Sequence, residues 1–160
     1  MTLPLAAWQQ LRDGQRPSHE RSPDQPVAAV FRCADAPVSI DAVFGQDAGA
    51  LFDISTWGHV VDKSVLGSLE YAVAVLHVPL IVVLGHDECG AVRAAIESTG
   101  IDAPSLPPHI WRQVAPIVPA VRRVLRAGAS RGVTSENVDA EEVGRQHLRD
   151  TVGSLLQSSE

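Results

Sequence analysis

Two short segments of the sequence place cysteine and histidine side chains where they could bind one metal ion together. Cys33-Ala34-Asp35 follows one apolar run, and His86-Asp87-Glu88-Cys89-Gly90 follows another. Two thiolates and one imidazole suit zinc, and three protein ligands leave a fourth position for water, as in catalytic zinc sites. Cys33, His86 and Cys89 are therefore candidate zinc ligands.

Asp35 is a candidate partner of whatever Cys33 binds. Side chains alternate along an extended segment, so Asp35 points to the same side as Cys33. Asp35 could also be a fourth ligand. Cys89 is expected to open a helix that runs through Ala95, where the positive helix end favours a thiolate.

The same residues have two other interpretations. The cysteines could be buried as small hydrophobic side chains, with His86 in a turn. A disulfide between Cys33 and Cys89 is also conceivable, although two cysteines in a reducing compartment seldom form one. The position of both segments directly after apolar runs favours the metal site over these alternatives.

The apolar patterns predict an α/β fold with a mainly parallel sheet flanked by helices. Strands are expected over residues 27–31, 51–55 and 80–84, the last being covered on both faces because it lacks polar alternation. Residues 64–76 have helical spacing, with Asp62 or Ser64 as N-cap and Pro79 beyond the end. Sites in such folds usually lie beyond the carboxyl ends of the strands.

Helical segments are also expected on either side of this region. Residues 110–125 form a helix interrupted by Pro116 and Pro119, and residues 143–156 form another. A short helix over residues 4–13 precedes a polar stretch that ends at Pro26. The predicted organisation is an N-terminal helix and arm over residues 1–26 and one zinc-binding domain over residues 27–160.

Composition excludes several classes of partner. The chain has 160 residues, 45% of them hydrophobic, with a net charge of −6. This acidic balance predicts neither a nucleic-acid partner nor an anionic membrane partner. The longest strongly apolar stretch, residues 78–84, is too short to span a bilayer. With no basic leader at the start of the sequence, we expect a cytoplasmic protein.

Three segments resemble the β-class carbonic anhydrases in order and spacing: residues 33–35, 67–73 and 81–92. The resemblance implies zinc on Cys33, His86 and Cys89, with Asp35 accepting a hydrogen bond from zinc-bound water. It places Gln46 near the substrate. Trp57 and Gly90 are candidate residues of the substrate pocket. The resemblance also implies the reversible hydration of carbon dioxide to bicarbonate, by a homodimer or a higher homo-oligomer.

The sequence departs from the family pattern at three positions. The usual Cys-x-Asp-x-Arg motif has Pro37 in place of the arginine that holds the aspartate, so Asp35 could swing onto the metal or rotate away. Ser55 stands where arginine is common. Trp57 replaces a small residue and either reshapes the pocket or fills a gap in the core.

These departures leave more than one function open. The leading hypothesis is a zinc-dependent carbonate dehydratase whose turnover is slow or pH-gated. The alternative is a catalytically inactive homologue that keeps zinc and acts as a structural or regulatory subunit. A third hypothesis is hydrolysis of a related small molecule such as carbonyl sulfide, for which Trp57 is the only hint. Family members also continue into further strands after the last helix, so the predicted fold is shortened at its C-terminus.

Overall fold

The structure is a computed structural model that describes residues 4–13, 25–103 and 105–158. Its contacts divide the chain into two compact units that interleave in sequence. The first contains the described residues of Met1–Arg32, Ala36–Ser55 and Val61–Leu84, and the second contains Cys33–Asp35, Thr56–Val60 and those of Gly85–Glu160. The predicted boundary after residue 26 stays a prediction, and most of the predicted arm lies outside the described residues.

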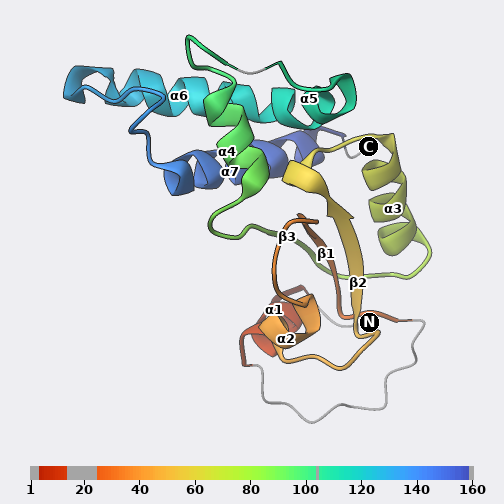
Figure 1. Cartoon of the computed structure of the whole chain (residues 1–160). Coiled ribbons are helices and arrows are strands. Elements are labelled where there is room, and N and C mark those ends of the chain that lie inside the picture. Colours follow the sequence, from red (N-terminus) through yellow and green to blue (C-terminus); the bar gives the residue numbers. More distant parts are fainter. Residues whose placement is uncertain (1–3, 14–24, 104, 159–160) are drawn as a thin grey trace. The chain divides into compact units, whose positions relative to one another are not determined.

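A three-stranded sheet forms the centre of the first unit (Figure 1). Its strands are β1 (Ala28–Cys33), β2 (Leu51–Thr56) and β3 (Ile81–Leu84), in the order β2-β1-β3. β1 and β3 are parallel, with Ala29 opposite Ile81 and Arg32 opposite Leu84. The mainly parallel α/β fold predicted from the apolar runs is thereby confirmed.

Strand β3 is less covered than predicted. Its four residues are exposed or half-buried, and Ile81 at its start is 39% exposed. β3 stands at one end of the strand order, so one of its edges has no partner strand among the described residues. The absence of polar alternation indicated burial on both faces, but sequence pattern alone does not report whether a strand is central or at an edge.

The helices of the first unit follow local sequence signals closely. α3 (Lys63–Ala74) begins after Asp62, whose carboxylate accepts hydrogen bonds from Ser64 N at 2.8 Å and Val65 N at 2.9 Å. These bonds satisfy backbone donors that a helix start leaves unpaired, which confirms Asp62 as the N-cap. α1 (Pro4–Asp13) is also present as predicted. The five-residue α2 (Ile40–Phe44) was not predicted, because it is too short for a periodic pattern.

The second unit is mostly helical. Its elements are η1 (Trp57–His59), α4 (Gly90–Glu97), α5 (Pro108–Val114), η2 (Ala115–Ile117), α6 (Val118–Gly128), η3 (Ala129–Arg131) and α7 (Ala140–Ser158). Pro116 and Pro119 break the middle of this run into α5, η2 and α6, as the sequence predicted. Buried side chains from α4, η2, α6 and α7 form the core of this unit, which includes Val92, Ile117, Val121 and Val143.

No helix in the described part of the chain combines the length and the apolar character needed to cross a membrane.

Candidate metal centre

Four potential ligands from two segments of the second unit converge on one point. Cys33 is the last residue of β1, His86 follows the end of β3, and Cys89 directly precedes α4. One donor atom from each of these residues and one carboxylate oxygen of Asp35 all lie within 4.8 Å of one another. The two segments that were predicted to meet beyond the strand ends therefore do meet.

The two cysteines are free thiols whose sulfur atoms are 3.7 Å apart, so they form no disulfide. The hydrogen bond from the Cys89 thiol to Cys33 Sγ lowers the pKa of Cys33 to about 4, although burial opposes this shift. The same bond, together with partial burial, raises the pKa of Cys89 well above its ordinary range. These opposite shifts favour ionisation of Cys33 before Cys89, and a cation would favour loss of both protons.

A backbone amide also stabilises the Cys33 thiolate. Gly58 N donates a hydrogen bond to Cys33 Sγ at 3.2 Å, and the cysteine side chain is fully buried. Gly58 has a φ of 79°, a conformation that residues with a Cβ adopt only at a cost. The glycine therefore allows the turn of η1 to aim its N–H at the sulfur.

His86 provides the test of whether these residues fit a metal. Both of its ring nitrogens are buried, and neither has a hydrogen-bond partner among the described residues. A buried polar nitrogen without a partner costs free energy, and coordination of one nitrogen would remove that cost. Together with two sulfurs at close range, this donor set could hold a metal ion, and it suits zinc chemically.

Asp35 is exposed, and its carboxylate is held by backbone rather than by a basic side chain. Oδ2 accepts a hydrogen bond from Gly90 N at 2.7 Å, at the start of α4. A Cβ at position 90 would lie 2.9 Å from this oxygen, so the close approach depends on glycine. Although Arg93 lies one turn along α4, it forms no ion pair with Asp35.

The remaining predicted site residues have different surroundings. Gln46 lies in the first unit, where its side-chain amide donates to the carbonyl of Phe44 at 3.0 Å. Trp57 is half-buried and packs against the core of the second unit. This packing agrees with a gap-filling role and gives no support to the third hypothesis, hydrolysis of a molecule such as carbonyl sulfide. The proposed roles of Gln46, Trp57 and Gly90 toward a substrate stay predictions.

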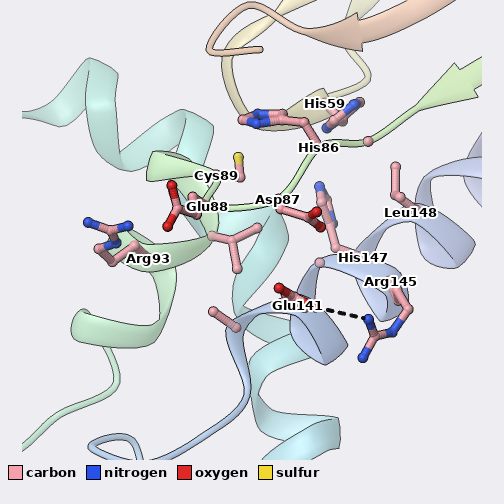
Figure 2. Close-up of a pocket in the computed structure, with 14 residues that line it drawn as sticks. His59, His86, Asp87, Glu88, Cys89, Arg93, Glu141, Arg145, His147 and Leu148 are labelled. Atoms are coloured by element: carbon pink, nitrogen blue, oxygen red, sulfur yellow. Dashed lines mark ion pairs between the residues drawn. The ribbon is translucent and has the colours of Figure 1, made fainter. Parts of the chain in front are cut away.

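A pocket of about 340 Å³ lies beside His86 and Cys89 (Figure 2). Its walls also contain His59 and His147, which sequence reasoning did not assign to any site. His147 is 5% exposed, and its Nε2 lies 2.7 Å from the carbonyl oxygen of Gly58. The one available signal was that His147, a polar residue, occupies an apolar position of the helical pattern over residues 143–156.

Burial makes His147 an acid-sensitive group near the centre. Desolvation lowers the pKa of His147 below its ordinary value, even though the Gly58 carbonyl, Asp150 and the Cys33 sulfur favour the protonated form. The ring of His59 also lies close, with the two ring centroids 6.4 Å apart. Nδ1 of His147 is buried without a hydrogen-bond partner among the described residues, so protonation there would bury an uncompensated donor.

We expect the stability of the metal-free, reduced protein to fall in mild acid because of His147. Histidines of the unfolded chain bind a proton near pH ~6.5, whereas folded His147 does so only at lower pH. Its stabilising contribution is therefore complete above about pH 6.5 and declines below it, by at most about 1.4 kcal/mol per pH unit. Urea unfolding at about pH 7.5 and about pH 5.5 checks this, with His147→Gln as reference. An equal acid loss in parent and variant would contradict it.

The sequence is similar to those of known proteins over most of its length. A family model described as carbonic anhydrase matches residues 28–159. Carbonic anhydrase 2 of Mycobacterium tuberculosis is 41% identical over 175 residues, which cover 99% of this chain and 80% of the relative. The chain belongs to the β-carbonic anhydrase family. A second member, the carbonic anhydrase of Mycolicibacterium smegmatis, is 39% identical over 173 residues, covering 98% of this chain and 79% of the relative.

Solved β-carbonic anhydrases share the fold. The crystal structure of the Aspergillus fumigatus enzyme matches with a TM-score of 0.68 at 23% identity, over 84% of this chain and 62% of that one. The Coccomyxa β-carbonic anhydrase, in complex with acetazolamide, matches with a TM-score of 0.66 at 24% identity, over 83% of this chain and 58% of that one. The chain thus spans less than two thirds of each of these solved β-carbonic anhydrases.

Proposed function

We propose that this chain is a zinc-dependent carbonic anhydrase-type lyase that interconverts carbon dioxide and bicarbonate. The convergence of Cys33, His86, Cys89 and Asp35 within 4.8 Å carries the proposal, because these are the donors that the β-carbonic anhydrase resemblance assigns to zinc catalysis. The names of the mycobacterial relatives support the same activity.

Cys33, His86 and Cys89 would hold the zinc ion. When bound, zinc would supply Lewis acidity that generates a hydroxide nucleophile near neutral pH. The hydrogen bonds from Gly58 N and with Cys89 favour the thiolate form of Cys33, which is the form that coordinates a metal. The ring of His86 offers a nitrogen ligand, and neutral imidazole is the form of histidine that ligates metals.

Asp35 would orient the nucleophile. Its Oδ2 accepts a hydrogen bond from Gly90 N. Its Oδ1 would be left to accept a hydrogen bond from the reacting water. Gly90 thereby fixes the carboxylate in the absence of the arginine that Pro37 replaces. A carboxylate held through one oxygen and exposed on the other side has fewer constraints than an arginine-paired one, so we expect a modest turnover.

Stopped-flow hydration of carbon dioxide tests the proposal. Reduced protein, stripped of metal and then loaded with one equivalent of zinc, should accelerate hydration between about pH 6.5 and 9, and the stripped protein should not. Pro37→Arg, assayed in parallel, should raise the rate because it adds a second restraint on Asp35.

A zinc-loaded parent with no activity would refute the proposed lyase. If Pro37→Arg then restored turnover, the natural chain would be the inactive, zinc-bearing homologue that is our second candidate. The observation that favours this candidate is the proximity of Asp35 to the other three donors, because a carboxylate acting as fourth ligand would close the metal to water.

Replacing Gly90 by alanine is expected to lower carbon dioxide hydration about tenfold while leaving zinc bound. The added Cβ would lie 2.9 Å from Asp35 Oδ2, so the carboxylate must move and the hydrogen bond from Gly90 N weakens. The fall should be smaller than the roughly 10²–10⁴-fold that a positioned proton-transferring group contributes, because the carboxylate is shifted rather than removed. Steady-state rates and zinc content of Gly90→Ala measure both effects.

Gly153→Ala is the matched control, because it adds a methyl group to a helix at a position with no atom within 4 Å. Equal activity of the Gly90→Ala variant and this control would show that Gly90 does not position Asp35.

We further propose a cytoplasmic homodimer or higher homo-oligomer. Leu5 and Trp8 on α1 are 68% and 44% exposed, which is unfavourable for a helix that faces only water. A tetrameric β-carbonic anhydrase of Sordaria macrospora has a similar fold. Light scattering at micromolar concentration would contradict the proposal if it found only monomer.

A further inference from the structure

The geometry points to His147 as a positioning residue for the metal-binding sulfur of Cys33, acting through the backbone of Gly58. The inference rests on the zinc site of the proposed function but does not require turnover. It assigns a role at the metal centre to α7, a helix that supplies none of the four donors.

The hydrogen bond from His147 has only one possible direction. Nε2 lies 2.7 Å from Gly58 O, and a carbonyl oxygen only accepts, so Nε2 carries the hydrogen. This bond is buried, and the side chain of His147 is shielded from solvent on nearly all sides. Water therefore cannot easily replace His147 as the donor to this carbonyl.

Gly58 is held from both directions. Its carbonyl accepts from His147, and its N–H donates to Cys33 Sγ at 3.2 Å. These two groups flank the same Cα, so fixing the carbonyl restrains the φ and ψ that aim the N–H. Glycine has the widest choice of backbone conformations. If the hydrogen bond to its carbonyl were removed, the φ and ψ of Gly58 would therefore vary more than those of another residue at this position.

The surrounding turn contains two residues in a backbone conformation that is unfavourable for most residues. Gly58 and His59 have successive positive φ values, of 79° and 55°. A positive φ is unfavourable for a residue with a Cβ, such as His59, so the turn needs external restraints. The bond from His147 is one such restraint, and it comes from a residue 89 positions away in sequence.

The hydrogen bond that Gly58 N–H donates to Cys33 Sγ should affect a bound metal. A hydrogen bond to a thiolate withdraws electron density from the sulfur, and such outer partners typically change metal affinity by about 10–100-fold. Loss of the restraint at Gly58 would leave the sulfur more electron-rich but less well placed.

Cobalt(II) and zinc are the probes for this inference. In cobalt-loaded parent protein the thiolate-to-cobalt charge-transfer absorption reports the electron density on sulfur. His147→Leu should shift this absorption to lower energy and weaken zinc binding about tenfold in a chelator competition. His147→Gln, whose amide can donate to Gly58 O, should restore most of both properties.

Thr151→Ala is the control for a purely structural effect. Thr151 is buried on α7 one turn after His147, so its removal perturbs the same helix without touching the bond to Gly58. This variant should keep the parental absorption and zinc affinity, even if it is equally destabilised.

Several results would overturn the inference. Parental spectra and zinc affinity in folded His147→Leu would do so, as would an equal shift in Thr151→Ala. If His147→Leu does not fold, His147→Asn, which keeps a polar side chain too short to replace Nε2, must show the same shift. A parent that binds cobalt without any thiolate absorption would refute the proposed metal site and this inference together.

Discussion

Cys89→Ser is expected to weaken zinc binding by more than about 100-fold, since changes beyond the first ligand shell alone cost about 10–100-fold. Serine keeps the size of the side chain, but its hydroxyl does not ionise near neutral pH and is a poor ligand for zinc. The loss also removes the close partner of Cys33, whose sulfur lies 3.7 Å away. Chelator competition on reduced protein measures the affinity directly.

Asp87→Asn is the matched control for this substitution. Asp87 is exposed and stands between His86 and Cys89, but it does not belong to the group of converging donors. The control should therefore bind one zinc ion with nearly parental affinity. If Cys89→Ser also kept parental affinity, Cys89 would not be a ligand, and the metal centre described above would be wrong.

Gly58→Ala is expected to destabilise the metal-free protein by about 2–5 kcal/mol. Two costs add at this position. A Cβ is disfavoured at a φ of 79°, and it would lie 3.0 Å from the Cβ of Ala91 and 3.1 Å from the Cδ1 of Ile117. Both neighbours are fully buried in the core of the second unit, so neither can move away freely. Urea unfolding measures the loss.

Gly49→Ala separates the two costs, because Gly49 has a similar φ of 86° with no atom within 4 Å. This control should lose only the backbone contribution, about 1–2 kcal/mol. Equal losses for Gly58→Ala and Gly49→Ala would mean that the core accommodates the methyl group, and that packing does not require glycine beside Cys33.

Much of the fold was predictable because its signals are local. Asp62 caps α3 because its side chain accepts hydrogen bonds from free backbone N–H groups. Pro116 and Pro119 divide the helical run after residue 108 because proline has no backbone N–H to donate. The environment of β3 was not predictable in this way. An edge position depends on which strands pair across the whole sheet, and an unbroken apolar run such as Ile81–Leu84 does not carry that information.

In the candidate site, too, some features could be predicted from local sequence and others depend on contacts between distant residues. The sequence predicted that Cys33, Asp35, His86 and Cys89 would meet, because both segments follow strands of one parallel sheet. It did not predict the hydrogen bond from Gly90 to Asp35. His147 was also missed, since its contact with Gly58 joins residues 89 positions apart and has no spacing rule.

The separation of the ligands along the chain makes a bound metal a cross-link as well as a cofactor. Cys33 and Cys89 are 56 residues apart, so one ion would close a long loop. In the chain-entropy model, tying a loop of this size is worth on the order of 4 kcal/mol against the unfolded ensemble. In an unfolded chain His86 and Cys89 are close along the sequence, but Cys33 comes near them only when the ends of β1 and β3 are brought together. The ion should therefore be captured late in folding, and its release should leave a chain that unfolds more readily.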